Sequence, residues 1–133
     1  METDTHPQKM TLGFINDKSP ILDRICNDLN ALGIEVLFRL ENIQDGLNYL
    51  LTLKILPKAC IIDLDFYDKN ILAQLQLLRT QYPTIQLIAH SDIDDKKVGK
   101  DLLDIGVSSY LLAGSDADDF KRAIDKDVNG YQI

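Results

Sequence analysis

Short runs of hydrophobic residues alternate along the chain with longer stretches in which hydrophobic residues recur every three or four positions. A short uninterrupted run is typical of a buried strand, and the longer spacing is typical of one face of a helix. The runs predict five strands, at Thr11–Ile15, Ile34–Phe38, Ala59–Asp63, Ile85–Ala89 and Ser108–Leu112. The spaced stretches predict five helices, at Pro20–Leu32, Ile43–Leu53, Asn70–Gln81, Asp94–Ile105 and Asp116–Val128.

Proline and glycine residues mark where several of these elements begin or end. Pro20 suits the first turn of its helix, where an N–H group would have no helical partner in any case. Gly33 and Gly106 are placed to end the first and fourth helices, because glycine readily adopts the left-handed conformation that often follows a helix. Pro57 and Pro83 break the chain before the third strand and after the third helix.

The last predicted helix begins in an acidic cluster. Ser115 lies three residues before Asp118, which resembles an N-terminal capping box with Asp in the place of the usual Glu. Acidic side chains also suit the positive end of a helix dipole. We therefore interpret this cluster as helix capping rather than as a metal site.

Strands that alternate with helices of this length predict a parallel sheet with helices on both faces, since the crossovers are right-handed. Five strands and five helices fit an α/β, flavodoxin-like, three-layer (βα)5 sandwich with strand order 2-1-3-4-5. That order makes the first and third strands neighbours. Asn16-Asp17 and Asp63 follow or close these two strands, so we expect them to meet at the carboxyl edge of the sheet, where such folds bind ligands.

Composition narrows the class of protein. The chain has 133 residues and a net charge of −7, with 21 acidic residues against 14 basic ones, which argues against a nucleic-acid or anionic-membrane surface on this segment. No hydrophobic stretch is long enough to span a membrane. Cys26 and Cys60 lack metal-site spacing and are predicted to be reduced and buried, as in a cytoplasmic protein. Residues 1–9 are predicted to be a disordered tail, 10–128 the folded domain, and 129–133 the start of a C-terminal linker.

The order of polar residues at the strand ends resembles the receiver domain of bacterial response regulators (CheY-like). Asn16-Asp17 stand where that family has a pair of acids after the first strand, and Asp63 matches its phosphate-accepting aspartate. Ser91 fits the Ser or Thr after the fourth strand, and Tyr110 fits the aromatic residue of the fifth. The segment Gly106–Leu112 looks most like regulators that carry a LuxR/NarL-type helix-turn-helix output domain.

The sequence also departs from the family pattern. Ala113 occupies the position of the family's lysine, and the first member of the acidic pair is Asn16. The loop after the acceptor reads Phe66-Tyr67-Asp68 instead of Met-Pro-Gly. A lysine that bonds a phosphate contributes roughly 1.5–3 kcal/mol, a large part of what a two-state switch needs. Lys18 and Lys69 are candidates to supply another cation near the strand ends.

The resemblance implies a magnesium site and a phosphoryl acceptor. It assigns Mg²⁺ to Asp17, Asp63 and the main-chain oxygen of Asp65, with Asn16 holding a metal-bound water. Because Asn16 brings one negative charge less than an acid, weaker metal binding is expected. The chain is not expected to be an enzyme beyond forming and hydrolysing its own acyl phosphate on Asp63.

The resemblance also implies a switch, in which Ser91 bonds the phosphoryl oxygen and Tyr110 moves inward in response. Each has a simpler interpretation, with Ser91 capping a loop and Tyr110 packing in a fixed position. His90, beside Ser91, is interpreted as a structural residue.

The partners implied by the family are a histidine kinase, an attached or separate DNA-binding domain, and a second copy of the chain. The pairing face would be built from the fourth helix, the fifth strand and the fifth helix. Its charges are opposed in sign, with Lys96, Lys97 and Lys100 on the fourth helix and Asp118, Asp119 and Asp125 on the fifth.

Two other functions stay open. The chain fits a degenerate receiver that acts through phosphorylation-independent protein contacts or dimerisation, which the missing lysine at Ala113 favours. A small-molecule enzyme or flavin binder on the same fold is disfavoured, because no glycine-rich phosphate loop follows the first strand.

Overall fold

The computed structural model describes residues 10–15, 21–64, 68–112 and 116–128. The predicted tail 1–9 and the predicted linker 129–133 lie outside these ranges. The predictions made for Asn16, Asp17, Lys18, Asp65 and Ala113 also fall outside them.

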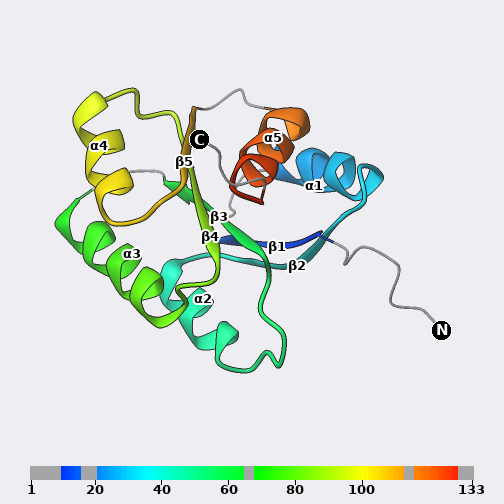
Figure 1. The fold of residues 1–133 in the computed structure, drawn as a ribbon, viewed down its shortest axis with the longest axis horizontal. Helices are drawn as coiled ribbons and strands as arrows, with labels where there is room; N and C mark the ends of the chain where they lie inside the picture. The colour runs from blue at the N-terminus through cyan, green and yellow to red at the C-terminus, as the bar shows by residue number, and fades with distance from the viewer. Residues whose placement is uncertain (1–9, 16–20, 65–67, 113–115, 129–133) are drawn as a thin grey trace.

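Within the described ranges, five strands alternate with five helices, as the hydrophobic pattern predicts (Figure 1). The strands are β1 (Met10–Ile15), β2 (Ile34–Leu40), β3 (Ala59–Leu64), β4 (Gln86–Ser91) and β5 (Ser109–Leu112). The helices are α1 (Ile21–Ala31), α2 (Ile43–Leu50), α3 (Lys69–Gln81), α4 (Lys96–Asp104) and α5 (Ala117–Val128). All neighbouring strands pair in parallel and the order is β2-β1-β3-β4-β5, which confirms the predicted flavodoxin-like topology.

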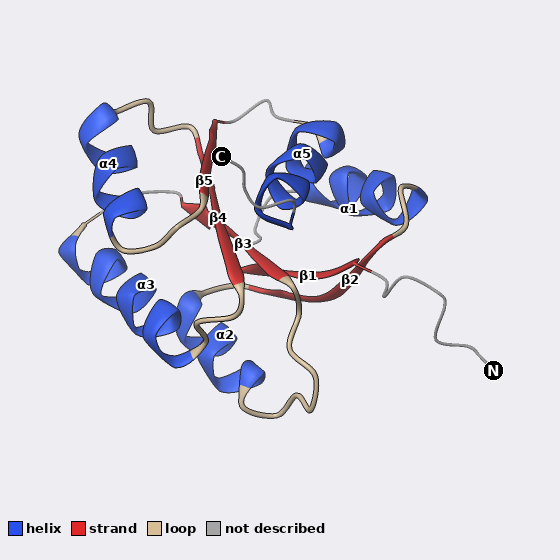
Figure 2. Cartoon of the chain, in the orientation of Figure 1, coloured by secondary structure: helices blue, strands red, loops and turns tan. Residues whose placement is uncertain are grey.

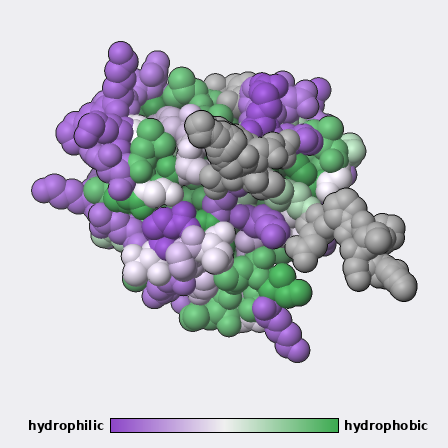
Figure 3. Space-filling view, in the orientation of Figure 1, coloured by the Kyte–Doolittle hydropathy of each residue, from purple (hydrophilic) through white to green (hydrophobic). Residues whose placement is uncertain are grey.

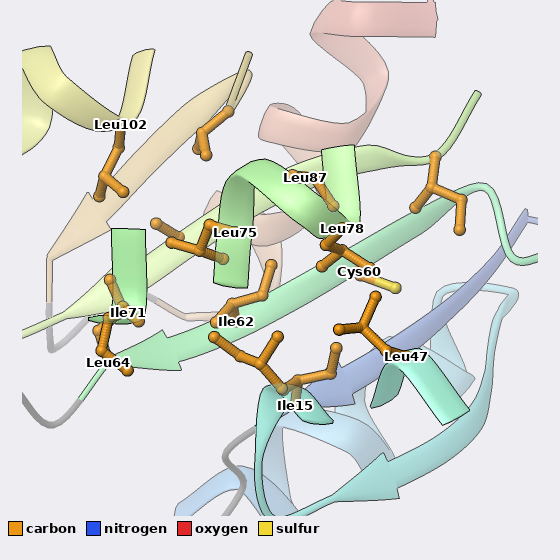
Figure 4. Packing of buried hydrophobic residues seen from close by; sticks show 14 of the residues in the cluster. Ile15, Leu47, Cys60, Ile62, Leu64, Ile71, Leu75, Leu78, Leu87 and Leu102 are labelled. Atoms are coloured by element: carbon orange, nitrogen blue, oxygen red, sulfur yellow. The ribbon is translucent and has the colours of Figure 1, made fainter. Parts of the chain in front are cut away.

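The sheet lies between two helical layers, with α1 and α5 on one face and α2, α3 and α4 on the other (Figure 2). Each face has its own hydrophobic core. The larger core joins α2, α3 and α4 to side chains such as Ile15, Ile62 and Leu87, which Figure 4 shows interleaved across the sheet. Successive side chains of β3 therefore point to opposite faces of the sheet. Ile61 joins the smaller core under α1 and α5, and Ile62 joins the larger one.

Close backbone packing explains one glycine in β1. The pairing of β1 with β2 shifts register between Leu12 and Gly13. The ring of Phe38 lies over Gly13, and a Cβ atom there would come within 2.2 Å of that ring. The absence of a side chain at this position is thus what lets Phe38 pack against the sheet.

Element ends follow local hydrogen bonds that the hydrophobic pattern does not show. The predicted end of α2 at Leu53 is wrong, because the helix ends at Leu50. The Thr52 hydroxyl donates to the Tyr49 carbonyl at 2.7 Å and closes a turn there. The predicted start of α4 at Asp94 is also early, since Asp95 is the N-cap and accepts a 2.8 Å hydrogen bond from the Lys97 amide.

The acidic cluster before α5 does cap that helix, through Asp116 and Asp119, whereas Ser115 of the predicted pair lies outside the described residues. The amide of Asp119 donates to the Asp116 carboxylate at 3.0 Å, and the amide of Asp116 donates to the Asp119 carboxylate at 3.0 Å. This reciprocal pair is a capping box with Asp116 as the N-cap. The backbone bond from Asp116 is the main cause that holds the pKa of Asp119 below its ordinary value.

The surface is unevenly polar (Figure 3). Hydrophilic side chains cover α4, whereas hydrophobic ones gather over the connection between α2 and β3, where Leu51 and Ile55 are largely exposed. That connection enters β3 at its amino end, so this hydrophobic surface lies at the opposite edge of the sheet from Asp63. In the part of the chain that the structure describes, no helix has the length and apolar character to cross a lipid bilayer.

Candidate functional site

The carboxyl ends of three central strands meet at one edge of the sheet. β1 ends at Ile15, whose register partner in β3 is Ile62. One residue further on, Asp63 is the register partner of His90 in β4, and Leu64 is the partner of Ser91. The predicted site residues Asp63 and Ser91 therefore lie on adjacent strands, one register position apart, and each is within a strand rather than after it.

Strand alternation directs the Asp63 side chain to the face covered by α1 and α5. Its neighbours Ile62 and Leu64 belong to the core on the opposite face. His90 follows the same rule, because the preceding Ala89 belongs to that opposite core and Ile88 to the smaller one. Asp63 and His90 thus project from adjacent strands toward the same side of the sheet.

The two side chains are in direct contact. His90 Nδ1 lies 3.0 Å from Asp63 Oδ1, and the two side chains are only 12% and 15% exposed. The His90 ring also packs against Phe120 of α5, with ring centroids 5.3 Å apart. Phe120 is fully buried and packs in turn against Phe14. The Asp63 carboxylate is therefore held from one side by a partly buried imidazole that α5 keeps in place.

The second ring nitrogen of His90 is buried, and no hydrogen-bond partner for Nε2 is found among the described residues. An ionised carboxylate only accepts hydrogen bonds, so the proton of this contact belongs to Nδ1. The tautomer that makes this contact carries its proton on Nδ1, so the imidazole is the donor and Asp63 Oδ1 the acceptor.

Ser91 faces the other side of the sheet and holds the start of the connection to α4. Its hydroxyl donates to the Leu64 carbonyl at 2.7 Å and accepts from the Ile93 amide at 3.1 Å. The side chain is buried. These bonds are those of a loop cap, one of the two interpretations that the sequence left open. A role toward a phosphoryl group stays a prediction.

Tyr110 is linked to the same connection. Its hydroxyl donates to the Ile93 carbonyl at 2.5 Å. Burial is the main cause that raises the pKa of the Tyr110 phenol; carboxylates of the connection raise it further, and a hydrogen bond with the Ser91 hydroxyl lowers it. Ser91, Ile93 and Tyr110 therefore form one hydrogen-bonded unit at the end of β4.

A groove of about 430 Å³ lies beside Tyr110, between α4, β5 and α5. Leu103, Leu111 and Ala123 give it a hydrophobic lining, and Asp119 and Arg122 lie on its α5 side. This groove belongs to the face that the resemblance assigns to dimerisation.

Three of the charged residues predicted for that face, Lys97, Lys100 and Asp119, are paired within their own helix. Lys97 pairs with Asp101 at 3.1 Å and Lys100 pairs with Asp104 at 3.3 Å, both along α4. On α5, Arg122 pairs with Asp119. If the predicted attraction between two copies used these three residues, it would have to displace existing pairs.

Only part of the predicted magnesium site can be placed. Asp63 is described, whereas Asn16, Asp17 and Asp65 fall outside the described ranges. Within those ranges, no three His, Cys, Asp or Glu side chains come close enough to hold a metal. The predicted ligands are carboxylate, amide and carbonyl oxygens, which is the donor set that suits Mg²⁺. Asp63 fits that set as a partly exposed carboxylate with one oxygen bonded to His90.

Of the substitute cations, Lys69 can be located. It is the first residue of α3 and is exposed. The contact that sequence reasoning missed is the one from His90, which the sequence suggested was structural. It depends on the strand register, and only the pairing of β3 with β4 could have indicated it.

Comparison with solved structures identifies the fold. The chain is similar to a response regulator from Thermotoga maritima, with 19% identity and a TM-score of 0.74 over 90% of this chain and 100% of the other. It is similar to RcsB from Salmonella enterica serovar Typhimurium bound to promoter rprA with the phosphomimetic BeF3−, with 18% identity and a TM-score of 0.73 over 87% of this chain and 66% of RcsB. It is also similar to the pilus assembly protein CpaE from Caulobacter crescentus, with 16% identity and a TM-score of 0.73 over 87% and 91% of the two chains.

Comparison with protein-family profiles gives no match, and comparison with curated protein sequences gives none either. At these identities the structural likeness establishes the fold, which is that of the CheY-like receiver domains of response regulators. The predicted resemblance is thereby confirmed for the fold.

Proposed function

We propose that the chain is a signalling receiver domain that accepts a phosphoryl group on Asp63 from a histidine kinase. The observation that carries the proposal is the position of Asp63. It is a partly exposed carboxylate at the carboxyl end of the central strand β3, in a receiver fold. A carboxylate at the end of a strand whose other residues are buried is costly for the fold, which favours a functional role for Asp63.

The reaction is nucleophilic substitution at phosphorus. A carboxylate oxygen of Asp63 attacks the phosphorus atom, the bond from phosphorus to the kinase histidine breaks, and its electron pair returns to the imidazole nitrogen. Since His90 engages Oδ1, the attacking atom is Oδ2. The product is an acyl phosphate on Asp63.

Both the attacking carboxylate and the phosphoryl group are anionic, so their approach needs a cation. A magnesium ion bound by Asp63, Asp17 and the main-chain oxygen of Asp65, with Asn16 on a bound water, would neutralise that repulsion. The resemblance implies that Ser91 bonds the phosphoryl group; for this, Ser91 would have to release the Leu64 carbonyl and turn from the face of the sheet opposite Asp63, and Tyr110 would follow because both are tied to Ile93.

The proposed consequence is control of an output, by an attached or partner DNA-binding domain or by pairing through the face of α4, β5 and α5. RcsB, which has the same fold, is bound to promoter DNA in its own structure. Both cysteines are free and buried, which is consistent with the reducing cytoplasm, where we place the chain.

A second candidate is a degenerate receiver that works through constitutive protein contacts. Two observations favour it. Ala113 replaces the lysine expected from the family. In addition, the Ser91 hydroxyl has both a donor and an acceptor partner in the protein, so a phosphoryl group would have to compete with them.

Phosphorylation with a small phosphodonor separates the two candidates. The protein is incubated with acetyl phosphate and Mg²⁺, and its intact mass is measured. The receiver proposal predicts a mass gain of one phosphoryl group that is lost in Asp63→Asn and on chelation of the metal. Asp68→Asn is the matched control, because Asp68 caps α3 and lies outside the predicted site.

A gain of equal size in Asp63→Asn would contradict the assignment of the acceptor. No gain in the unaltered chain at any metal concentration would contradict the receiver proposal and favour the degenerate one.

A further inference from the structure

The contact between His90 and Asp63 has a chemical consequence beyond packing. Building on the proposed phosphorylation of Asp63, we infer that His90 is a catalytic residue for hydrolysis of the acyl phosphate. The hydrogen bond that Nδ1 donates to Asp63 Oδ1, 3.0 Å long, stabilises the carboxylate as it leaves.

The hydrogen bond is set by the fold rather than by two mobile surface side chains. Asp63 and His90 are register partners on adjacent parallel strands, and both side chains are mostly buried. Phe120 packs against the imidazole ring and Phe14 packs against Phe120, so the ring has little freedom to turn away. The donor is thus in place before any reaction.

In hydrolysis, a water oxygen attacks the phosphorus atom and the bond from phosphorus to Asp63 Oδ2 breaks. The electron pair of that bond stays on Asp63, which regains a full negative charge, and the proton of the water leaves with inorganic phosphate or solvent. Oδ1 accepts the bond from His90 before and after this step. A hydrogen bond to a charged acceptor is about twice as strong as one to a neutral acceptor.

The bond from His90 therefore strengthens as the carboxylate forms, and it lowers the barrier to hydrolysis. When the acceptor oxygen changes from a neutral carbonyl to a charged carboxylate, the hydrogen bond gains enough strength to lower the barrier by an amount that corresponds to roughly a fivefold change in rate. His90 should shorten the lifetime of the phosphorylated state by about that factor. In this chain Ala113 occupies the position of the family's lysine. Among the described residues, His90 is a polar side chain that contacts Asp63.

The test compares three substitutions at position 90. His90→Asn places an amide N–H near the site of Nδ1 and retains the donor. His90→Leu keeps much of the volume against Phe120 but has no donor. His90→Gln places its amide nearer the site of Nε2, and it replaces His90→Leu should that variant not fold.

Each protein is phosphorylated with acetyl phosphate and Mg²⁺, freed of donor by rapid desalting, and followed by intact mass. The expected decay of the phosphorylated form is about fivefold slower in His90→Leu than in the unaltered chain, with His90→Asn restoring the faster rate. Equal decay in His90→Leu and the unaltered chain would overturn the inference. So would equal slowing in His90→Leu and His90→Asn, which would indicate packing alone.

A spectroscopic readout tests the same hydrogen bond without any reaction. The chain has two histidines, His6 and His90, so the ring ¹⁵N signals can be assigned with a His90 variant. A proton on Nδ1, with its shift changed in Asp63→Asn, supports the contact, and a proton on Nε2 alone overturns it. Failure of the unaltered chain to gain phosphate would refute the proposed function, whereas phosphorylation with unaltered decay in His90→Leu would refute this inference alone.

Discussion

Arg79 is expected to be a major contributor to stability although it lies far from the site. It is near the end of α3, and its guanidinium donates to the carbonyls of Tyr82 (2.9 Å), Gly106 (3.1 Å) and Ile85. These carbonyls belong to the connection before β4 and the connection before β5. One side chain therefore ties together three segments at the amino edge of the sheet.

The magnitude follows from these bonds. A hydrogen bond that involves a charged group contributes about 1.5–3 kcal/mol, and three such bonds set an upper limit. Arg79 is partly exposed, so water can replace some of the lost donors. We expect Arg79→Met, which keeps the hydrophobic stem beside Gly106, to lower the free energy of unfolding by about 3 kcal/mol, near 10 °C in melting temperature.

The measurement is urea unfolding followed by circular dichroism, with an unchanged slope against denaturant. Arg122→Met is the matched control, because Arg122 pairs with Asp119 on the surface of α5, and its loss should cost less than about 0.5 kcal/mol. Below its melting temperature, Arg79→Met should still gain phosphate on Asp63. Equal stability of the two variants would refute this account of Arg79.

Two further predictions concern the core. Gly13→Ala should destabilise the protein by about 1–3 kcal/mol because the added Cβ meets the Phe38 ring. Gly99→Ala, in open space on α4, should instead stabilise it by up to about 1 kcal/mol. Thermal melts of both variants check this, and a lower melting temperature in both would contradict it. Burial raises the pKa of the Cys60 thiol from 9.0 to about 12. The folded chain should therefore resist thiol reagents at Cys60, and it should lose stability as pH rises from 9 toward 12, because this thiol ionises first in the unfolded chain. Rapid labelling of Cys60 in the native protein at pH 8 would count against this.

Much of the fold could be predicted from the sequence because its signals are local. Hydrophobic runs and helical spacing identified every strand and helix among the described residues, and the βαβ alternation, matched to the flavodoxin-like order, gave the strand order. The ends were less certain, because they depend on single hydrogen bonds. Thr52 closes a turn where α2 ends, and Asp116 forms the capping pair with Asp119 at the start of α5.

The site was predictable only in part. Asp63 could be placed at the sheet edge because it ends a hydrophobic run, and Ser91 because it stands two residues beyond the run Ile85–Ala89. The contact of His90 with Asp63 could not, because it needs the register of β3 against β4, and a slip of one residue would direct His90 to the other face. The bonds of Ser91 to Leu64 and Ile93 depend on the same register.

The central claim is that Asp63 is the residue that carries the phosphoryl group. Treatment of the phosphorylated chain with sodium borohydride reduces an aspartyl phosphate to homoserine, and peptide mass spectrometry then locates that residue. The account predicts homoserine at position 63. Homoserine at position 65 or 68 instead, or at no position in a chain that has gained phosphate, would contradict it.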